Sequence, residues 1–173
     1  MKRGTCLLLT ALLLIMACAG AQLPETHDAA AADSAAEVED VKYVALTFDD
    51  GPSPRCTPRL LDGLKERNVH ATFFVVGCQV VKDPDIVERM AAEGHQVGNH
   101  SYDHKELDKL SAWEAAEDMR KNDALLQELL GEGDYWVRQP YGLLSEEERQ
   151  ALTVPVIGWS VDTEDWKSKD AGK

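Results

Sequence analysis

The stretch "VALTFDDGPSP", residues 44–54, is an apolar run that ends in two adjacent carboxylates, Asp49 and Asp50, before a Gly-Pro turn. The β-branched and apolar residues of 42–48 predict a buried strand. Taken alone, Asp-Asp-Gly-Pro also has the composition of an ordinary turn. Two like charges at the end of a buried strand repel each other, so the pair is unexpected there unless it has a task.

Beyond residue 41 the sequence alternates the patterns of strands and helices. The segment 71–77, "ATFFVVG", is apolar on both faces, as strands buried in parallel sheets are. Repeated strand-helix-strand units predict a parallel α/β sheet, because each crossover must cover a face of the sheet. The pattern alone fits either an open sheet or a closed barrel. The expected strands are 42–48, 71–77, 95–100, 134–138 and 154–161, and the expected helices start near residues 57, 83, 111 and 145.

Three of the expected helices carry start signals. Thr57 is followed by a proline at the start of the first helix, and Asp83 is expected to cap the second. Ser111 and Glu114 have the spacing of a capping box for a long helix that runs to about residue 130. The apolar side of this long helix is expected to consist of Trp113, Ala116, Leu126 and Leu129.

The first 40 residues differ from the rest. Lys2 and Arg3 precede an apolar stretch too short to span a bilayer, so we expect 1–21 to be a secretory signal peptide. Two processing routes stay open, namely cleavage after small residues or lipid modification of Cys18, since "LIMAC" resembles a bacterial lipobox. Residues 22–40 are acidic, Ala-rich and free of aromatics, as linkers are. We expect export to the cell envelope or beyond, with membrane attachment only through a lipid on Cys18.

Length and charge limit the remaining choices. At 173 residues, the chain has room for one domain, expected at 41–173, and we expect a monomer. The net charge of −13 argues against nucleic acid as a partner, because an acidic surface repels phosphates. Cys56 and Cys78 are the cysteines of this domain. They could pair in an oxidising compartment or remain separate small hydrophobic residues, and the sequence leaves both open.

Polar residues follow four of the five expected strands. In parallel α/β folds the functional residues gather beyond the carboxyl ends of the strands. His100 and His104 are one helical turn apart in sequence, a spacing that suits a metal but that exposed histidines also share by chance. The residues that we expect at this rim are Asp49, Asp50, His100, His104, Arg138, Tyr141, Asp162, Asp165 and Trp166.

Taken in order, "TFDDGP", "HSYDH", "RQPYG" and "DTEDW" resemble the first four of five motifs in the NodB-homology polysaccharide deacetylases, the family 4 carbohydrate esterases. The resemblance covers 41–173 and implies a distorted parallel (β/α) barrel. It also implies that Asp50, His100 and His104 hold a divalent metal. Two imidazoles and a carboxylate suit zinc best, and cobalt or another first-row ion is an alternative.

The resemblance assigns roles to the other rim residues as well. Asp49 would be the general base, and Arg138 would pair with and orient that carboxylate. The backbone N–H of Tyr141 would stabilise the oxyanion, while Asp165 would orient a catalytic histidine. Tyr141 and Trp166 would contact the sugar, although Trp166 could equally be a core residue.

The fifth motif of the family, an apolar strand followed by Leu, one residue and His, has no counterpart here, since no histidine follows His104. We therefore expect an incomplete domain that lacks the last strands of the barrel and the general acid. The expected function is metal-dependent N-deacetylation of an N-acetylated glycan, with peptidoglycan N-acetylglucosamine as the leading substrate. The alternatives are a non-catalytic envelope protein that binds glycan or metal, a chitin-oligosaccharide deacetylase and an acetylxylan esterase.

Overall fold

The computed structural model describes residues 42–143, 145–152 and 154–168. The expected signal peptide (1–21), Cys18 and the linker (22–40) lie outside the described residues. Among the residues that are described, no helix is long and apolar enough to cross a bilayer.

The sheet is parallel, and its strands lie in chain order. It consists of β1 (Thr47–Gly51), β2 (Thr72–Val75) and β3 (Gln96–Asn99), in the order β1-β2-β3. Beyond β3, single parallel bridges join its last residue to Val137 and Val137 to Val156. All five segments therefore run side by side in sequence order, which is the arrangement of a singly wound barrel.

The second and third predicted strands, 71–77 and 95–100, are shortened to Thr72–Val75 and Gln96–Asn99, and the other three predicted strands differ more. The first begins at Thr47 instead of residue 42, and the side chains of Tyr43 and Val44 are almost fully exposed. Only the carbonyl of Leu46, just before β1, joins the ladder, by accepting a hydrogen bond from the N–H of Thr72. The fourth and fifth predicted strands are reduced to single parallel bridges. The fourth segment lies beside β3, and the fifth lies beside the fourth, as expected.

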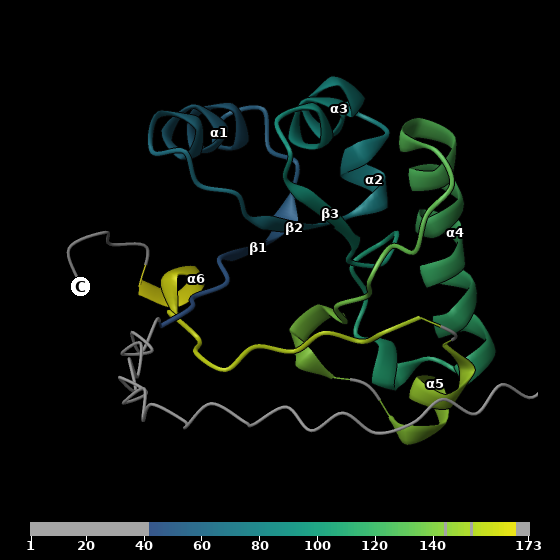
Figure 1. Ribbon diagram of the computed structural model, residues 1–173. Coiled ribbons are helices and arrows are strands. Elements are labelled where there is room, and N and C mark those ends of the chain that lie inside the picture. Colours follow the sequence, from purple (N-terminus) through teal and green to yellow (C-terminus); the bar gives the residue numbers. More distant parts are fainter. Residues whose placement is uncertain (1–41, 144, 153, 169–173) are drawn as a thin grey trace, which may run out of the picture. The chain divides into compact units, whose positions relative to one another are not determined.

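The main helices follow one another along one face of the sheet (Figure 1). The helix α3 contacts both α1 and α4, and α3 and α4 each contact β3. Because every crossover covers the same face, the helices form the outer layer of a barrel-type fold. The helices are α1 (Thr57–Glu66), α2 (Gly77–Val80), α3 (Pro84–Ala92), α4 (Ala112–Leu130), α5 (Glu146–Ala151) and α6 (Asp165–Ser168), with 3₁₀ turns η1 (Leu107–Lys109) and η2 (Pro140–Gly142).

The long helix α4 confirms one prediction and corrects another. Ser111 and Glu114 form the predicted capping box, in which each side chain bonds the backbone N–H of the other residue. Trp113, however, was expected on the apolar side and is 74% exposed. Two polar residues, Asp118 and Asn122, are buried instead. The predicted side-chain cap at Asp83 is also wrong, since no hydrogen bond from that side chain caps α3.

Alternate residues of β2 point to opposite faces of the sheet, as in any strand. Phe73 and Val75 join the core between sheet and helices, where they meet side chains such as Leu61 and Met90. Phe74 points the other way, and the guanidinium carbon of Arg138 lies 4.2 Å from its ring centroid. The inner face of the sheet therefore carries the groups of the candidate site.

Both cysteines of the domain are free thiols. Cys56 lies exposed at the start of α1, and Cys78 is half-buried in α2. The sequence left open whether Cys56 and Cys78 form a disulfide, and in the structure they do not.

Candidate active site

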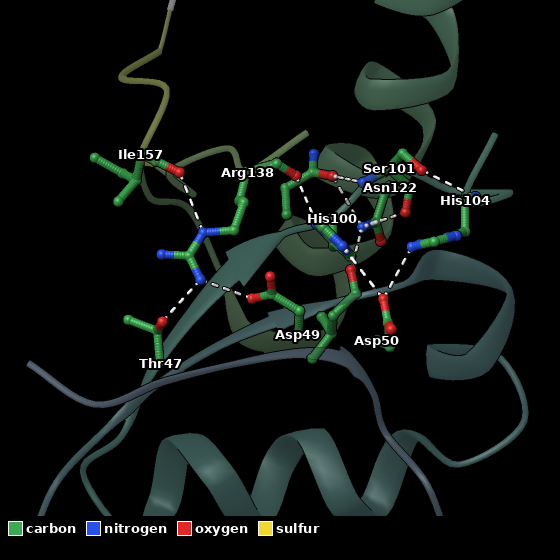
Figure 2. Close-up of polar contacts among 11 residues, drawn as sticks. Thr47, Asp49, Asp50, His100, Ser101, His104, Asn122, Arg138 and Ile157 are labelled. Carbon is green, nitrogen blue, oxygen red and sulfur yellow. Dashed lines mark hydrogen bonds and ion pairs between the residues drawn. The ribbon is translucent and has the colours of Figure 1, made fainter. Parts of the chain in front are cut away.

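The end of β1 separates the two adjacent carboxylates. Its pairing with β2 shifts register between Phe48 and Gly51, and Asp50 has a left-handed backbone with φ of 67°. Irregularities of this kind re-aim side chains at the end of a strand. Asp49 therefore faces Arg138 and Asp50 faces two histidines (Figure 2).

Asp50 lies between His100 and His104. Its Oδ1 is 3.3 Å from Nε2 of His100 and 2.9 Å from Nε2 of His104. One ligand atom from each of the three residues lies within 4.8 Å of the others. Hydrogen bonds from the imidazoles of His100 and His104 hold the pKa of Asp50 well below its ordinary value, and the hydrogen bond to Asp50 raises the pKa of His104.

The tautomer of His100 is set by the backbone. His100 is buried, and its Nδ1 lies 2.6 Å from the carbonyl oxygen of Arg138, which can only accept a hydrogen bond. Nδ1 therefore carries a proton, and Nε2 faces the carboxylate of Asp50. Either a second proton or a metal cation must lie between these two atoms, because their lone pairs repel. Two imidazole nitrogens and one carboxylate oxygen fit a divalent metal such as zinc.

A loop, and not a helical turn, carries the two histidines. Ser101 and His104 both have left-handed backbones, with φ of 64° and 55°. The loop is held from the side of α4, where Oδ2 of Asp118 accepts hydrogen bonds from the N–H groups of Tyr102 (2.8 Å) and Asp103 (3.3 Å). The spacing of one helical turn in sequence therefore does not correspond to a helix here.

Asn122 of α4 connects the ends of two strands to this loop. Its Nδ2 lies 2.8 Å from the carbonyl oxygen of Val75, 3.0 Å from Oδ1 of Asn99 and 3.0 Å from the carbonyl oxygen of Ser101. Sequence reasoning missed this residue and Asp118. The available signal was their spacing, because two polar residues four apart share one side of a helix, here the side that Ala115 and other apolar residues occupy.

Arg138 connects the first segment of the sheet to the last. Its side chain is only 3% exposed. Nη1 donates 2.8 Å hydrogen bonds to Oγ1 of Thr47 and Oδ1 of Asp49. Nε and Nη2 donate to the carbonyls of Ile157 (3.1 Å) and Gly158 (2.9 Å). Oδ2 of Asp49 has no hydrogen-bond partner among the described residues, so it remains available to a substrate or water.

Tyr141 joins the cluster through its ring. The ring packs edge-to-face on His104 with a centroid distance of 4.8 Å, and the residue is largely exposed. Its backbone is left-handed, with φ of 60°. Within the described ranges, no acceptor is hydrogen-bonded to its N–H, so this donor is free for a ligand.

The acidic segment after the fifth strand is not brought into the cluster. Asp165 starts α6 and accepts a 2.7 Å hydrogen bond from Oγ1 of Thr163, while Oδ1 of Asp162 accepts from the N–H of Glu164. Trp166 is exposed. Neither Asp165 nor Trp166 contacts the residues around Asp50 within the part of the chain that is described.

Comparison with known protein families identifies the family of the chain. Residues 36–154 match the family model described as polysaccharide deacetylase. The chain belongs to this family. As a polysaccharide deacetylase domain, it has the parallel α/β barrel-type fold that its motifs implied, with three barrel strands formed among the described residues.

Several curated relatives of this domain are named as peptidoglycan deacetylases. The chain is 47% identical over 131 residues to peptidoglycan-N-acetylglucosamine deacetylase PgdA of Listeria monocytogenes, covering 76% of this chain and 28% of that protein. It is 44% identical to the peptidoglycan-N-acetylglucosamine deacetylase of Bacillus cereus, covering 74% of this chain and 48% of that protein. The chain thus spans less than half the length of these relatives.

Solved structures of polysaccharide deacetylases superpose on the domain. Peptidoglycan deacetylase PdaC of Bacillus subtilis matches with a TM-score of 0.71 and 43% identity, over 73% of this chain and 62% of that one. The Bc1960 peptidoglycan N-acetylglucosamine deacetylase, solved with 4-naphthalen-1-yl-N-oxidanyl-benzamide, matches with a TM-score of 0.67 and 44% identity, over 71% of this chain and 59% of that one.

Proposed function

We propose that the protein is a metal-dependent deacetylase that hydrolyses the N-acetyl group of N-acetylglucosamine in peptidoglycan. The observation that carries the proposal is the arrangement at the end of β1, where Asp50 meets His100 and His104 while Asp49 is held separately by Arg138. The names of the relatives support the choice of peptidoglycan as substrate.

Asp50, His100 and His104 would hold the divalent cation, for which zinc is the leading candidate and cobalt or another first-row ion the alternative. Such a cation supplies Lewis acidity, which lowers the pKa of water to about 7 and polarises a carbonyl. The ligand of the Bc1960 structure is a hydroxamic acid by its name, and hydroxamic acids chelate metals through two oxygens. This supports a metal in the site.

Asp49 has the geometry of a general base. Arg138 occupies its Oδ1, which leaves Oδ2 to take a proton from the attacking water. As the acetamide carbonyl becomes tetrahedral, the free backbone N–H of Tyr141 would donate to the developing oxyanion. The products are acetate and a free amino sugar.

The departing amine needs a proton. In the family this comes from the histidine of the fifth motif, which Asp165 would orient. The sequence has no histidine after His104, so in this chain water would have to supply the proton. Trp166 and the ring of Tyr141 would offer aromatic surfaces to the sugar. These roles rest on the motif "DTEDW" and on the exposure of both aromatic rings.

We propose that the protein is exported to the cell envelope. Residues 1–21 would direct export, with Cys18 lipidated if the lipobox is used, and 22–40 would act as a flexible spacer. The domain would then work as a monomer next to the cell wall.

Acetate release from purified peptidoglycan, with zinc and with a chelator, tests the proposal. Asp49→Asn keeps the size of the side chain and is expected to retain zinc while it lowers acetate release by about two to four orders of magnitude. Asp50→Ala is expected to lose both zinc and activity. Equal zinc loss in the two variants would mean that the roles of these carboxylates are exchanged.

This assay tests the proposed substrate and the proposed hydrolysis separately. Acetate release from acetylxylan but not from peptidoglycan would contradict the proposed substrate. Metal-dependent binding of an N-acetylglucosamine oligomer with no acetate release would support a non-catalytic binding protein instead.

A further inference from the structure

The side chain of Trp113 is not part of the hydrophobic core. It is the second residue of α4, and it is 74% exposed, whereas Ala115 and Met119 of the same helix are buried. Sequence reasoning placed it with the apolar residues of the helix. The core therefore does not account for a tryptophan at this position.

Trp113 lies at the end of α4 that follows the histidine loop. The helix α4 follows β3, and the loop between them carries His104, so the first residues of α4 lie at the carboxyl end of the strands (Figure 1). Active sites of parallel barrels occupy this same rim. Lys105, which directly follows His104, lines a pocket together with Trp113. Asp118 also lines it and holds the histidine loop.

The pocket combines one apolar surface with polar groups of both signs. Its volume is about 220 Å³, below the roughly 300–1,000 Å³ of cavities that enclose drug-sized ligands, so it suits a single ring-sized group. Trp113 and Leu110 supply the apolar part, and Lys105, Lys121 and Glu117 are among the polar groups. A sugar residue matches this lining, because it has an apolar C–H face and a rim of hydroxyls.

Both lysines of the pocket are already held in place. The Nζ of Lys105 lies 2.7 Å from Oδ2 of Asp103, and the Nζ of Lys121 lies 3.4 Å from the ring centroid of Tyr102. Donors fixed in advance lose less conformational entropy when a ligand binds. Glu114 and Glu117 beside Trp113 disfavour an anionic ligand. The pocket therefore suits a neutral sugar better than a phosphate.

We propose that the pocket around Trp113 is a distal subsite that binds one residue of the glycan strand whose reacting residue lies at Asp50. The indole would stack on the C–H face of the sugar. The inference rests on the proposed function for the identity of the strand. It predicts that long oligomers bind more tightly than short ones and that Trp113 is responsible for part of the difference.

The test uses the full chain with zinc in the Asp49→Asn background, so that oligomers are not consumed. The chain has four tryptophans, and the indole N–H signal of Trp113 in an NMR spectrum is identified by its loss in Trp113→Ala. The N-acetylglucosamine pentamer is expected to shift this signal. Trp113→Ala should weaken pentamer binding by about 3- to 10-fold and leave the binding of the dimer unchanged. Trp113→Phe should restore most of the pentamer affinity.

Tyr43→Ala is the matched control, because it removes an exposed aromatic ring that precedes β1 at the opposite end of the strand. It should change neither oligomer's affinity. No shift of the Trp113 signal, or equal losses for dimer and pentamer, would overturn the subsite. If the wild-type chain releases acetate and Trp113→Ala binds the pentamer normally, only the subsite fails. If no acetate is released but the pentamer still shifts the Trp113 signal, the subsite stands and the deacetylase proposal fails.

Discussion

Replacing Arg138 by Met is expected to destabilise the domain by at least about 3 kcal/mol. Removing one partner of a buried ion pair costs about 3–5 kcal/mol, because the other charge is left without compensation. Asp49 is 32% exposed, so water recovers part of this cost and the lower end of the range applies. The same substitution also removes the hydrogen bonds to Thr47, Ile157 and Gly158.

Urea unfolding of wild type and variants measures this loss. Thr47→Val removes a single acceptor of Arg138 and should cost only about 1 kcal/mol. Arg138→Lys keeps the charge but not the planar fork, so it should fall between the two. Zinc binding should persist in Arg138→Met, because the backbone carbonyl that orients His100 remains. A free energy of unfolding for Arg138→Met within about 1 kcal/mol of wild type would refute this account of the ion pair.

Three further predictions concern positions that hold the fold around the site. Asn122→Ala should lower the free energy of unfolding by about 1–3 kcal/mol in urea titrations, since its amide bridges three buried oxygens. Gly98→Ala should cost about 1–3 kcal/mol in the same assay, because the added Cβ would lie 2.7 Å from ring carbons of Phe74, whereas Gly133→Ala, with nothing closer than 3.9 Å, should be nearly neutral. Burial lowers the pKa of His95, so the folded state prefers the neutral ring, and stability should fall as the pH drops below about 6.5; a wild-type chain whose pH dependence between 7.5 and 5.5 equals that of His95→Gln would contradict this.

The convergence of the polar residues was predictable from the sequence. Asp50, His100 and Arg138 each follow an apolar segment, and parallel strands bring their carboxyl ends to one rim. The capping box at Ser111 was equally visible, because it depends only on local spacing. The apolar runs that mark the strand ends and the spacing of the capping box can both be read from short stretches of sequence.

Other features depend on contacts between distant segments, and pattern reasoning did not find them. The separation of Asp49 from Asp50, which only the family resemblance implied, arises from a register shift and a left-handed backbone at Asp50. Aspartate adopts this backbone only occasionally, so periodicity does not predict it. Asn122 and Trp113 were misjudged because periodicity assumes that apolar residues face inward. In α4, Asn122 faces inward and donates a hydrogen bond to the carbonyl of Ser101 in the histidine loop. Trp113 of the same helix faces outward.

Isothermal titration calorimetry at neutral pH measures the zinc stoichiometry of the chain and so tests whether Asp50, His100 and His104 form a metal site. About one equivalent per chain is predicted from the single cluster of Asp50, His100 and His104 found among the described residues. Asp50→Ala and His100→Ala should each abolish this binding, while Asp49→Asn should retain it. Unchanged zinc binding in Asp50→Ala, or no zinc binding by the wild-type chain, would contradict the assignment of this cluster as the metal site.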